Sequence, residues 1–142
     1  MRILQLIDSL DTGGAERVAV NYANALQNHI EFSALGVTRK EGALKELLYD
    51  EVPYLFLKRT KTVDIAALLR LRRFIREHKI QILQAHGSCY FIASLVKMIT
   101  PGLKLIWHDH YGNSEYLENR AVGFLKWSSK TFDAVFAVNE NL

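Results

Sequence analysis

The sequence predicts an α/β protein with a doubly wound, Rossmann-like parallel sheet of six strands and helices on both faces, forming a three-layer sandwich. Short apolar runs alternate with helical patterns along the chain, and Pro53 and Pro101 stand at the starts of expected strands. Each right-handed crossover between parallel strands needs a helix to return the chain. With 142 residues, 49% of them hydrophobic, we expect a single domain over residues 1–142.

The first expected unit is a strand, a tight loop and a helix. Apolar residues predict a strand over 3–7, and the helical spacing from Ala15 to Leu26 predicts a helix. Between them, Gly13 and Gly14 admit backbone conformations that are closed to other residues. Free amides at the start of a helix favour an anion, so the loop is a candidate anion site. A tight turn without a ligand is the alternative.

The other elements follow in the same alternation. Further strands are expected over 30–37, 52–58, 80–86, 103–109 and 132–139. Helices are expected over 42–50, 63–79, 88–99 and 115–130. We predict the strand order 3-2-1-4-5-6, because ligands bind where the winding of such a sheet reverses. This order brings Gly13, His86 and His108 to one edge of the sheet.

Composition limits the classes of partner and compartment. The net charge of +3, without a nucleic-acid-binding motif, gives no reason to expect nucleic acid. The single cysteine, Cys89, excludes an internal disulfide and is expected in buried packing rather than as a nucleophile. No signal peptide or stretch long enough to cross a bilayer is visible, so a cytoplasmic location is expected.

The densest group of chemical side chains follows the fifth strand in "WHDHYGN". His108 and His110 point to one side of the strand end and Asp109 to the other, within reach of a polar ligand. His86, at the end of the fourth strand, lies at the same edge. No third ligand stands at a recognisable spacing from His108 and His110, so no metal is expected. Histidines satisfied by the loop backbone are the structural alternative.

A basic helix is expected over 63–79. Arg70, Arg73 and Arg76 lie on its outer stripes, whereas the sheet-facing side is formed by Leu68, Leu71, Phe74 and Ile75. A solvated face is one interpretation, and peripheral contact with anionic lipid on the inner face of the membrane is the other.

Two common functions of this architecture lack their motifs. "DTGGAE" is not the G-x-G-x-x-G fingerprint of dinucleotide-binding enzymes, and the second strand ends in "GVTRK" without a ribose-binding carboxylate. The phosphate-loop motif of NTPases is missing as well. A non-catalytic Rossmann-like binding or scaffold module remains an alternative.

A resemblance extends over essentially the whole chain. The segments "DTGGAERVAVNYANAL", "AHGSCY", "IWHDHYG" and "FDAVFAVNENL" resemble the N-terminal, acceptor-side domain of the GT-B fold glycosyltransferases of the retaining family 4. The resemblance implies transfer of a hexose from a nucleotide-diphosphate sugar to a saccharide or lipid-linked acceptor in cell-envelope or polysaccharide biosynthesis. It implies no metal and no cofactor beyond that co-substrate.

The resemblance also implies roles for single residues. Gly13 and Gly14 match the loop near the donor diphosphate, and His108, followed by Asp109, matches the histidine beside the transferred sugar. His86 matches an acceptor-side position, and by location His110, Tyr111 and Asn113 are expected to shape the acceptor pocket. Members of the family continue into a C-terminal domain that binds the nucleotide. Because that domain is missing from these residues, the chain by itself is expected to be inactive.

Overall fold

The computed structural model describes residues 1–110 and 122–137. The strands are β1 (Arg2–Ser9), β2 (Phe32–Lys40), β3 (Tyr54–Phe56), β4 (Ile82–His86), β5 (Lys104–Asp109) and β6 (Ala134–Ala137). The helices are α1 (Gly14–Leu26), α2 (Ile65–Glu77), α3 (Tyr90–Met98) and α4 (Val122–Ser129), with 3₁₀ helices η1 (Ala43–Leu47) and η2 (Gly87–Cys89). Within these residues, no helix combines the length and the apolar character needed to span a membrane.

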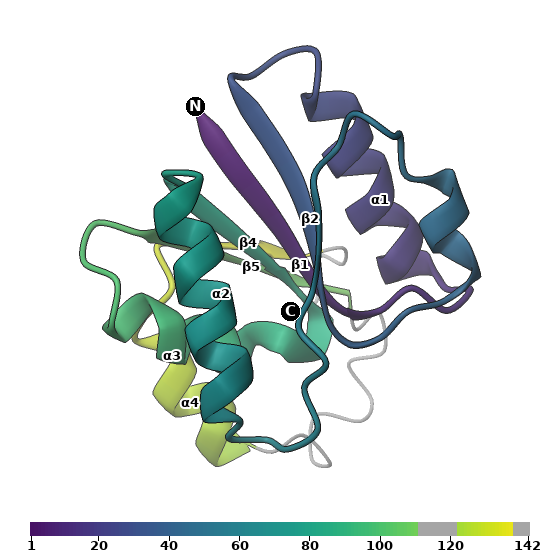
Figure 1. Cartoon of the computed structure of the whole chain (residues 1–142). Coiled ribbons are helices and arrows are strands. Elements are labelled where there is room, and N and C mark those ends of the chain that lie inside the picture. The colour runs from purple at the N-terminus through teal and green to yellow at the C-terminus, as the bar shows by residue number, and fades with distance from the viewer. Residues whose placement is uncertain (111–121, 138–142) are drawn as a thin grey trace.

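The six strands form one parallel sheet in the order β3-β2-β1-β4-β5-β6, which confirms the predicted order. β1 lies inside the sheet, between β2 and β4 (Figure 1). The winding reverses between β1 and β4, so the carboxyl ends of these two strands flank the position at which such folds bind ligands.

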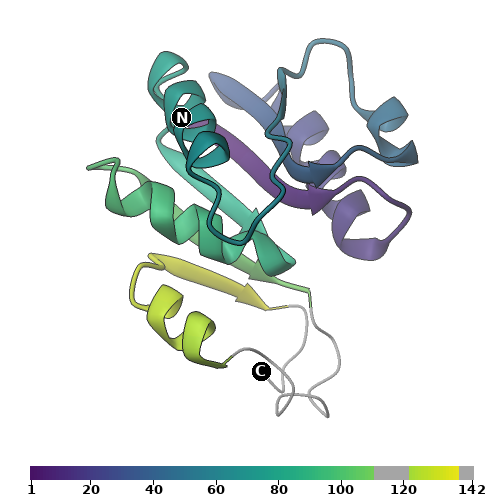
Figure 2. The same cartoon turned by 60° about the horizontal axis from the view of Figure 1, so that its bottom comes forward.

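Helices cover the sheet from both sides, as the sequence predicts. Alternate residues of β1 enter two separate cores, because successive side chains of a strand point to opposite faces. Leu4 and Leu6 pack with residues of α2 and α3, whereas Ile7 packs with residues of α1 and with Leu44 of η1. In Figures 1 and 2, α2, α3 and α4 lie together on one side of the sheet and α1 lies on the other.

The structure shortens several expected elements. The segment 42–50 forms only the 3₁₀ helix η1, since Leu44 is its one buried residue and the Leu44 N–H donates to the Leu10 carbonyl. A Cβ atom at Gly42 would run into the Leu10 backbone, so the two loops pack in direct contact. The helix expected over 88–99 begins as η2 before α3, and the helix expected over 115–130 is described only from Val122.

The start of α2 is determined by its sequence. Asp64 is the N-cap, and its carboxylate accepts hydrogen bonds from the Ala67 and Thr60 N–H groups at 3.1 Å each. These hydrogen bonds lower the pKa of Asp64, because they stabilise its charged form. The cap fixes the direction of α2, whose Leu71 and Ile75 are buried against the sheet.

Candidate functional site

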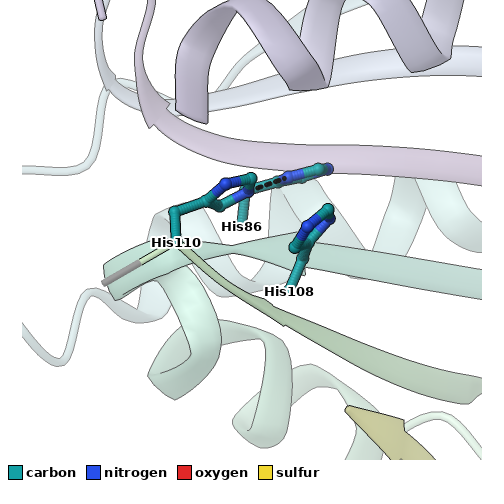
Figure 3. Close-up of side chains that lie close together, drawn as sticks. All are labelled: His86, His108 and His110. Atoms are coloured by element: carbon teal, nitrogen blue, oxygen red, sulfur yellow. Dashed lines mark hydrogen bonds between the residues drawn. The ribbon is translucent and has the colours of Figure 1, made fainter. Parts of the chain in front are cut away.

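The ends of β4 and β5 bring three histidines together on the face of the sheet that α1 covers. His86 pairs with His108 in the register of these parallel strands. Because side chains alternate along a strand, the histidine at 110 returns to the side of His108. Figure 3 shows the imidazoles of His86, His108 and His110 gathered beside the ribbon of α1 and β1. The sequence predicts the shared edge, but the direct contact of all three rings depends on the register.

The histidines form a hydrogen-bonded cluster with two glutamines. His86 Nδ1 lies 2.9 Å from His110 Nε2, and His86 Nε2 lies 2.6 Å from Gln5 Oε1. Since the amide oxygen of Gln5 only accepts, His86 Nε2 carries the proton, and Nδ1 accepts from His110. Gln84 Nε2 contacts His108 Nδ1 at 3.2 Å. The His108 and His110 rings stack with their centroids 4.0 Å apart.

Burial keeps all three imidazoles neutral at neutral pH. Burial, followed by the charges of His110 and His108, lowers the pKa of His86 to about 2. Burial and His110 lower the pKa of His108 to about 4, against the opposing effect of Asp109. Burial also lowers the pKa of His110, again opposed by Asp109. The cluster therefore offers neutral donors, acceptors and metal ligands rather than cations.

The glycine loop lies at the same edge of the sheet. A cavity of about 240 Å³ joins the start of α1 to the histidines, and it is lined by Ile7, Asp8, Ser9, Ala15, Glu16, His86, Gly87, Ser88 and His110. Gly13, Gly14 and His108 are not among these residues, although His108 stacks on His110. The start of α1 therefore borders the same cavity as His86 and His110, and it does so through Ala15 and Glu16 rather than through the glycines.

The backbone of the glycine pair differs from the expectation. Gly13 is the N-cap of α1 with a φ of −168°, an extended conformation that any residue adopts, so the pair is not required for its conformational freedom. A Cβ atom at Gly13 would meet the flexible carboxylate of Glu16, whereas one at Gly14 would enter open space. No side chain accepts a hydrogen bond as the N-cap of α1. The start of α1 therefore has amides without a side-chain cap, and the Glu16 carboxylate occupies the space beside Gly13.

Beside the cavity, the Asp8 carboxylate at the end of β1 lies at the centre of a cluster of polar side chains. The sequence pattern does not predict this cluster. Asp8 accepts hydrogen bonds from the hydroxyls of Thr38 and Ser88 and lies 3.8 Å from the buried guanidinium of Arg59. Burial, together with the charge of Arg39, lowers the pKa of Arg59. A second cavity, of about 440 Å³, is lined by Asp8, Arg39, Arg59, Thr62, Ser88, Tyr90, Phe91 and Phe124.

Sequence reasoning also missed Tyr22, Gln5 and Gln84. The Tyr22 ring, on α1, lies 6.2 Å from His86 and 5.9 Å from His108 between centroids. Gln5 is fully buried in the central strand, and Gln84 is 6% exposed. A glutamine in an otherwise apolar strand is the signal that could have found both, because a buried amide requires a polar partner.

The remaining candidate residues are placed as follows. Asp109 is 3% exposed at the end of β5, and Cys89 is fully buried, with its thiol near the Leu6 carbonyl at 2.9 Å. Burial raises the pKa of the Cys89 thiol, which fits the expected packing role. Tyr111 and Asn113 lie outside the described residues.

Two arginines of the basic helix α2 form hydrogen bonds to backbone carbonyls, so not all of its cations are available to a partner. The Arg70 guanidinium donates to the Leu57 carbonyl, with its Nε at 3.1 Å, and Arg72 donates to the Ile99 carbonyl at 3.0 Å. Arg73 and Arg76 line a shallow groove with Leu69, Arg72 and Glu77. Arg70 is therefore an anchor between α2 and the end of β3, and Arg73 and Arg76 lie in the outer groove.

Comparisons with known proteins agree with this arrangement. Residues 12–142 match the model of Glycosyltransferase Family 4. The fold is similar to that of MurG from Acinetobacter baumannii, with a TM-score of 0.65 and 14% identity. That similarity covers 96% of this chain and 41% of the MurG chain, so the present chain spans less than half of its structural relative. No curated protein sequence matches the chain. Since the family model extends over nearly the whole sequence, the chain belongs to glycosyltransferase family 4.

Proposed function

We propose that this chain is the acceptor-side domain of a retaining glycosyltransferase. The enzyme would transfer a hexose from a nucleotide-diphosphate sugar to a saccharide or lipid-linked acceptor in cell-envelope or polysaccharide biosynthesis. Family membership supports glycosyl transfer. The observation that carries the proposal is the cavity shared by the start of α1 and the histidines, because it places an anion-favouring helix end beside neutral imidazoles.

Groups in the cavity and beside it have separate roles in this proposal. The uncapped start of α1 at Gly13 and Gly14 gives amide donors to the donor diphosphate. His108, neutral because of its lowered pKa, exchanges hydrogen bonds with hydroxyls of the transferred sugar. His86 and His110 contribute to the acceptor side, where they line the cavity. A C-terminal domain supplies most of the nucleotide contacts, and the transfer itself uses no cofactor beyond the co-substrate.

The test is an activity screen of the full-length protein against a panel of nucleotide sugars, with release of the nucleoside diphosphate as the measurement. Turnover with one donor and a saccharide or lipid-linked acceptor would support the proposal, and the anomeric configuration of the product would test retention. A protein that binds sugars or nucleotides without turning them over would instead be a non-catalytic binding or scaffold module.

We also propose that α2 contacts anionic lipid on the cytoplasmic face of a membrane. Ile65 is 62% exposed and Leu69 is 53% exposed, and Leu69 shares its groove with Arg73 and Arg76. Exposed apolar side chains beside cations suit the interface of an acidic bilayer.

The membrane proposal predicts that reversing Arg73 and Arg76 to Glu weakens sedimentation with acidic vesicles. Each reversal should cost about 1 kcal/mol or more of binding near such a surface, and added salt should have the same effect. Neutral vesicles provide the control. Sedimentation that the double reversal leaves unchanged would contradict the proposal. Arg70 is left unchanged in this variant, because its hydrogen bond to the Leu57 carbonyl contributes to the fold.

A further inference from the structure

We propose that His86, His108 and His110 form a binding site for a divalent transition metal, with Zn²⁺ as the preferred ion. Each of these residues offers one ring nitrogen, and the three nitrogens lie within 4.8 Å of one another. Three protein ligands with an open fourth position is an arrangement that zinc adopts in proteins. This inference goes beyond the proposed transfer, which needs no metal.

To bind one ion, the three ligand nitrogens must draw together around it, and the stacked rings of His108 and His110, with centroids 4.0 Å apart, must turn so that their lone pairs converge. In tetrahedral zinc sites with bonds of about 2.1 Å, the ligand atoms lie roughly 3.4 Å apart. His86 Nδ1 and His110 Nε2 are 2.9 Å apart, so a slight separation would admit the ion between them. His86 and His108 are opposite each other on paired strands, which holds the backbone of two ligands rigidly. His86 and His110 also line the cavity of about 240 Å³, which gives an ion access and leaves space for a water molecule as fourth ligand.

Two glutamines form the outer shell that such histidines need. Gln5 Oε1 accepts a hydrogen bond from the Nε2–H of His86, so the lone pair of His86 Nδ1 faces the cluster. Gln84 contacts Nδ1 of His108, and a half-turn of its amide presents oxygen to that nitrogen, which leaves Nε2 for a metal. Gln5 is fully buried, and its Nε2 has no hydrogen-bond partner in the described part of the chain. Within the described residues, the Gln5 amide is therefore held to the cluster through its oxygen.

Metal binding need not release a proton from the His86 and His110 rings, because the ring proton can move within His110. Without metal, His110 Nε2 donates its hydrogen to His86 Nδ1. On binding, both nitrogens give their lone pairs to Zn²⁺, and the proton of His110 moves to its Nδ1 as the ring takes its other neutral tautomer. No oxidation or reduction is involved.

His108 belongs both to the metal site and to the proposed contact with the transferred sugar. If the proposed function is correct, metal binding should therefore affect sugar transfer. A metal on His108 would withdraw its ring nitrogen from the sugar. Zinc is therefore expected to inhibit transfer reversibly, with a chelator restoring the activity. Zinc binding itself requires no donor or acceptor, so failure of the transfer proposal leaves the metal proposal independently testable.

The experiment is a calorimetric titration of the untagged, chelator-treated protein with ZnCl₂, accompanied by Co²⁺ absorption spectra. We expect one zinc per chain with a Kd of about 1 μM or below and the visible bands of tetrahedral cobalt. His110→Ala should weaken binding at least about tenfold, and Gln5→Leu about 10-fold or more through the outer shell. His29→Ala is the matched control, since His29 is exposed and far from the cluster in sequence, and it should bind like the parent protein.

Circular dichroism of each variant shows whether a loss of zinc binding comes from unfolding. His86 is buried, so a His86 variant can fail by unfolding, whereas His110 is half-buried at the end of the strand. His110→Ala is therefore the deciding variant. Absence of zinc binding by the folded parent protein would overturn the proposal. Binding that His110→Ala and Gln5→Leu leave unchanged would overturn it as well, because the ion would then be held elsewhere.

Discussion

Two single residues lead to different predictions: His108 for the turnover of the enzyme and Asp133 for the stability of the fold. His108 stacks on His110 and contacts Gln84, so both its ring face and its Nδ1 have partners. Asp133 accepts hydrogen bonds from Lys97 and from the Leu105 N–H. The first side chain belongs to the cluster beside the cavity, and the second joins α3 and β5 to the start of β6.

In the full-length enzyme, His108→Ala is expected to lower kcat by about 100-fold and to change donor affinity much less. A group that exchanges hydrogen bonds with the reacting sugar acts mainly in the transition state. Steady-state kinetics and donor titration measure the two effects separately. His29→Ala serves as the control, and an equal loss in that variant would contradict the assignment.

Asp133 predicts a pH dependence of stability. Burial by itself would raise the pKa of Asp133, but hydrogen bonds from Lys97 and the Leu105 N–H, with the charges of Lys97 and Lys104, lower it. A lowered folded-state pKa stabilises the fold above the unfolded pKa, and this contribution is lost as the pH falls below about 4. Because the carboxylate is one-third exposed, we expect about 1 kcal/mol at most.

The measurement is urea unfolding of the parent protein and Asp133→Asn between pH 6 and pH 3. The variant should be less stable at pH 6, and the difference should shrink toward pH 3. A difference that is constant over this range would show that the charge of Asp133 does not contribute.

Among the helices and strands, α2 has a buried face and an exposed face, and leucines within one turn of each other lie on the two faces. Leu71 is fully buried in the core beneath α2, whereas Leu69, two positions earlier, is 53% exposed. Deleting a buried leucine side chain removes its transfer free energy and leaves a cavity. Leu71→Ala is therefore expected to lower the free energy of unfolding by about 2–5 kcal/mol. Leu69→Ala is expected to change it by less than about 0.5 kcal/mol.

Urea unfolding of both leucine variants checks this contrast. The two substitutions remove the same atoms from the same helix, so helix propensity cancels between them. A Leu69 variant as unstable as the Leu71 variant would mean that the outer face of α2 is covered in the protein, and it would also count against a free membrane-binding surface.

At the scale of the whole molecule, the sheet and its two cores are expected to fold without further chain, whereas tight donor binding is not expected. The start of α1 offers only a few amides to a diphosphate in contact with water, each worth roughly 1 kcal/mol. About 4 kcal/mol in total corresponds to a millimolar Kd. Calorimetry of this chain with UDP- and GDP-sugars measures it. Micromolar binding or measurable transfer would show that a second domain is not needed.

The sequence by itself determined the order of the strands and the edge at which polar residues collect. Alternation of strands and helices, with right-handed crossovers, leaves few topologies, and the reversal at β1 and β4 follows from them. Period-two spacing also predicted that His108 and His110 share a face, because they stand two positions apart at the end of β5. These predictions depend on local pattern and chirality, which a sequence carries directly.

The tertiary structure decided which side chains meet. His86 is 22 residues before His108, and only the register of β4 against β5 makes it the third member of the cluster. Gln5 reaches the same cluster from β1, the strand paired with β4, and the Arg70 guanidinium on α2 donates to the Leu57 carbonyl beyond the end of β3. Such contacts depend on the register of paired strands and on rotamers selected by close packing. These are nonlocal quantities, so the local sequence pattern does not show that His86 contacts the other two histidines.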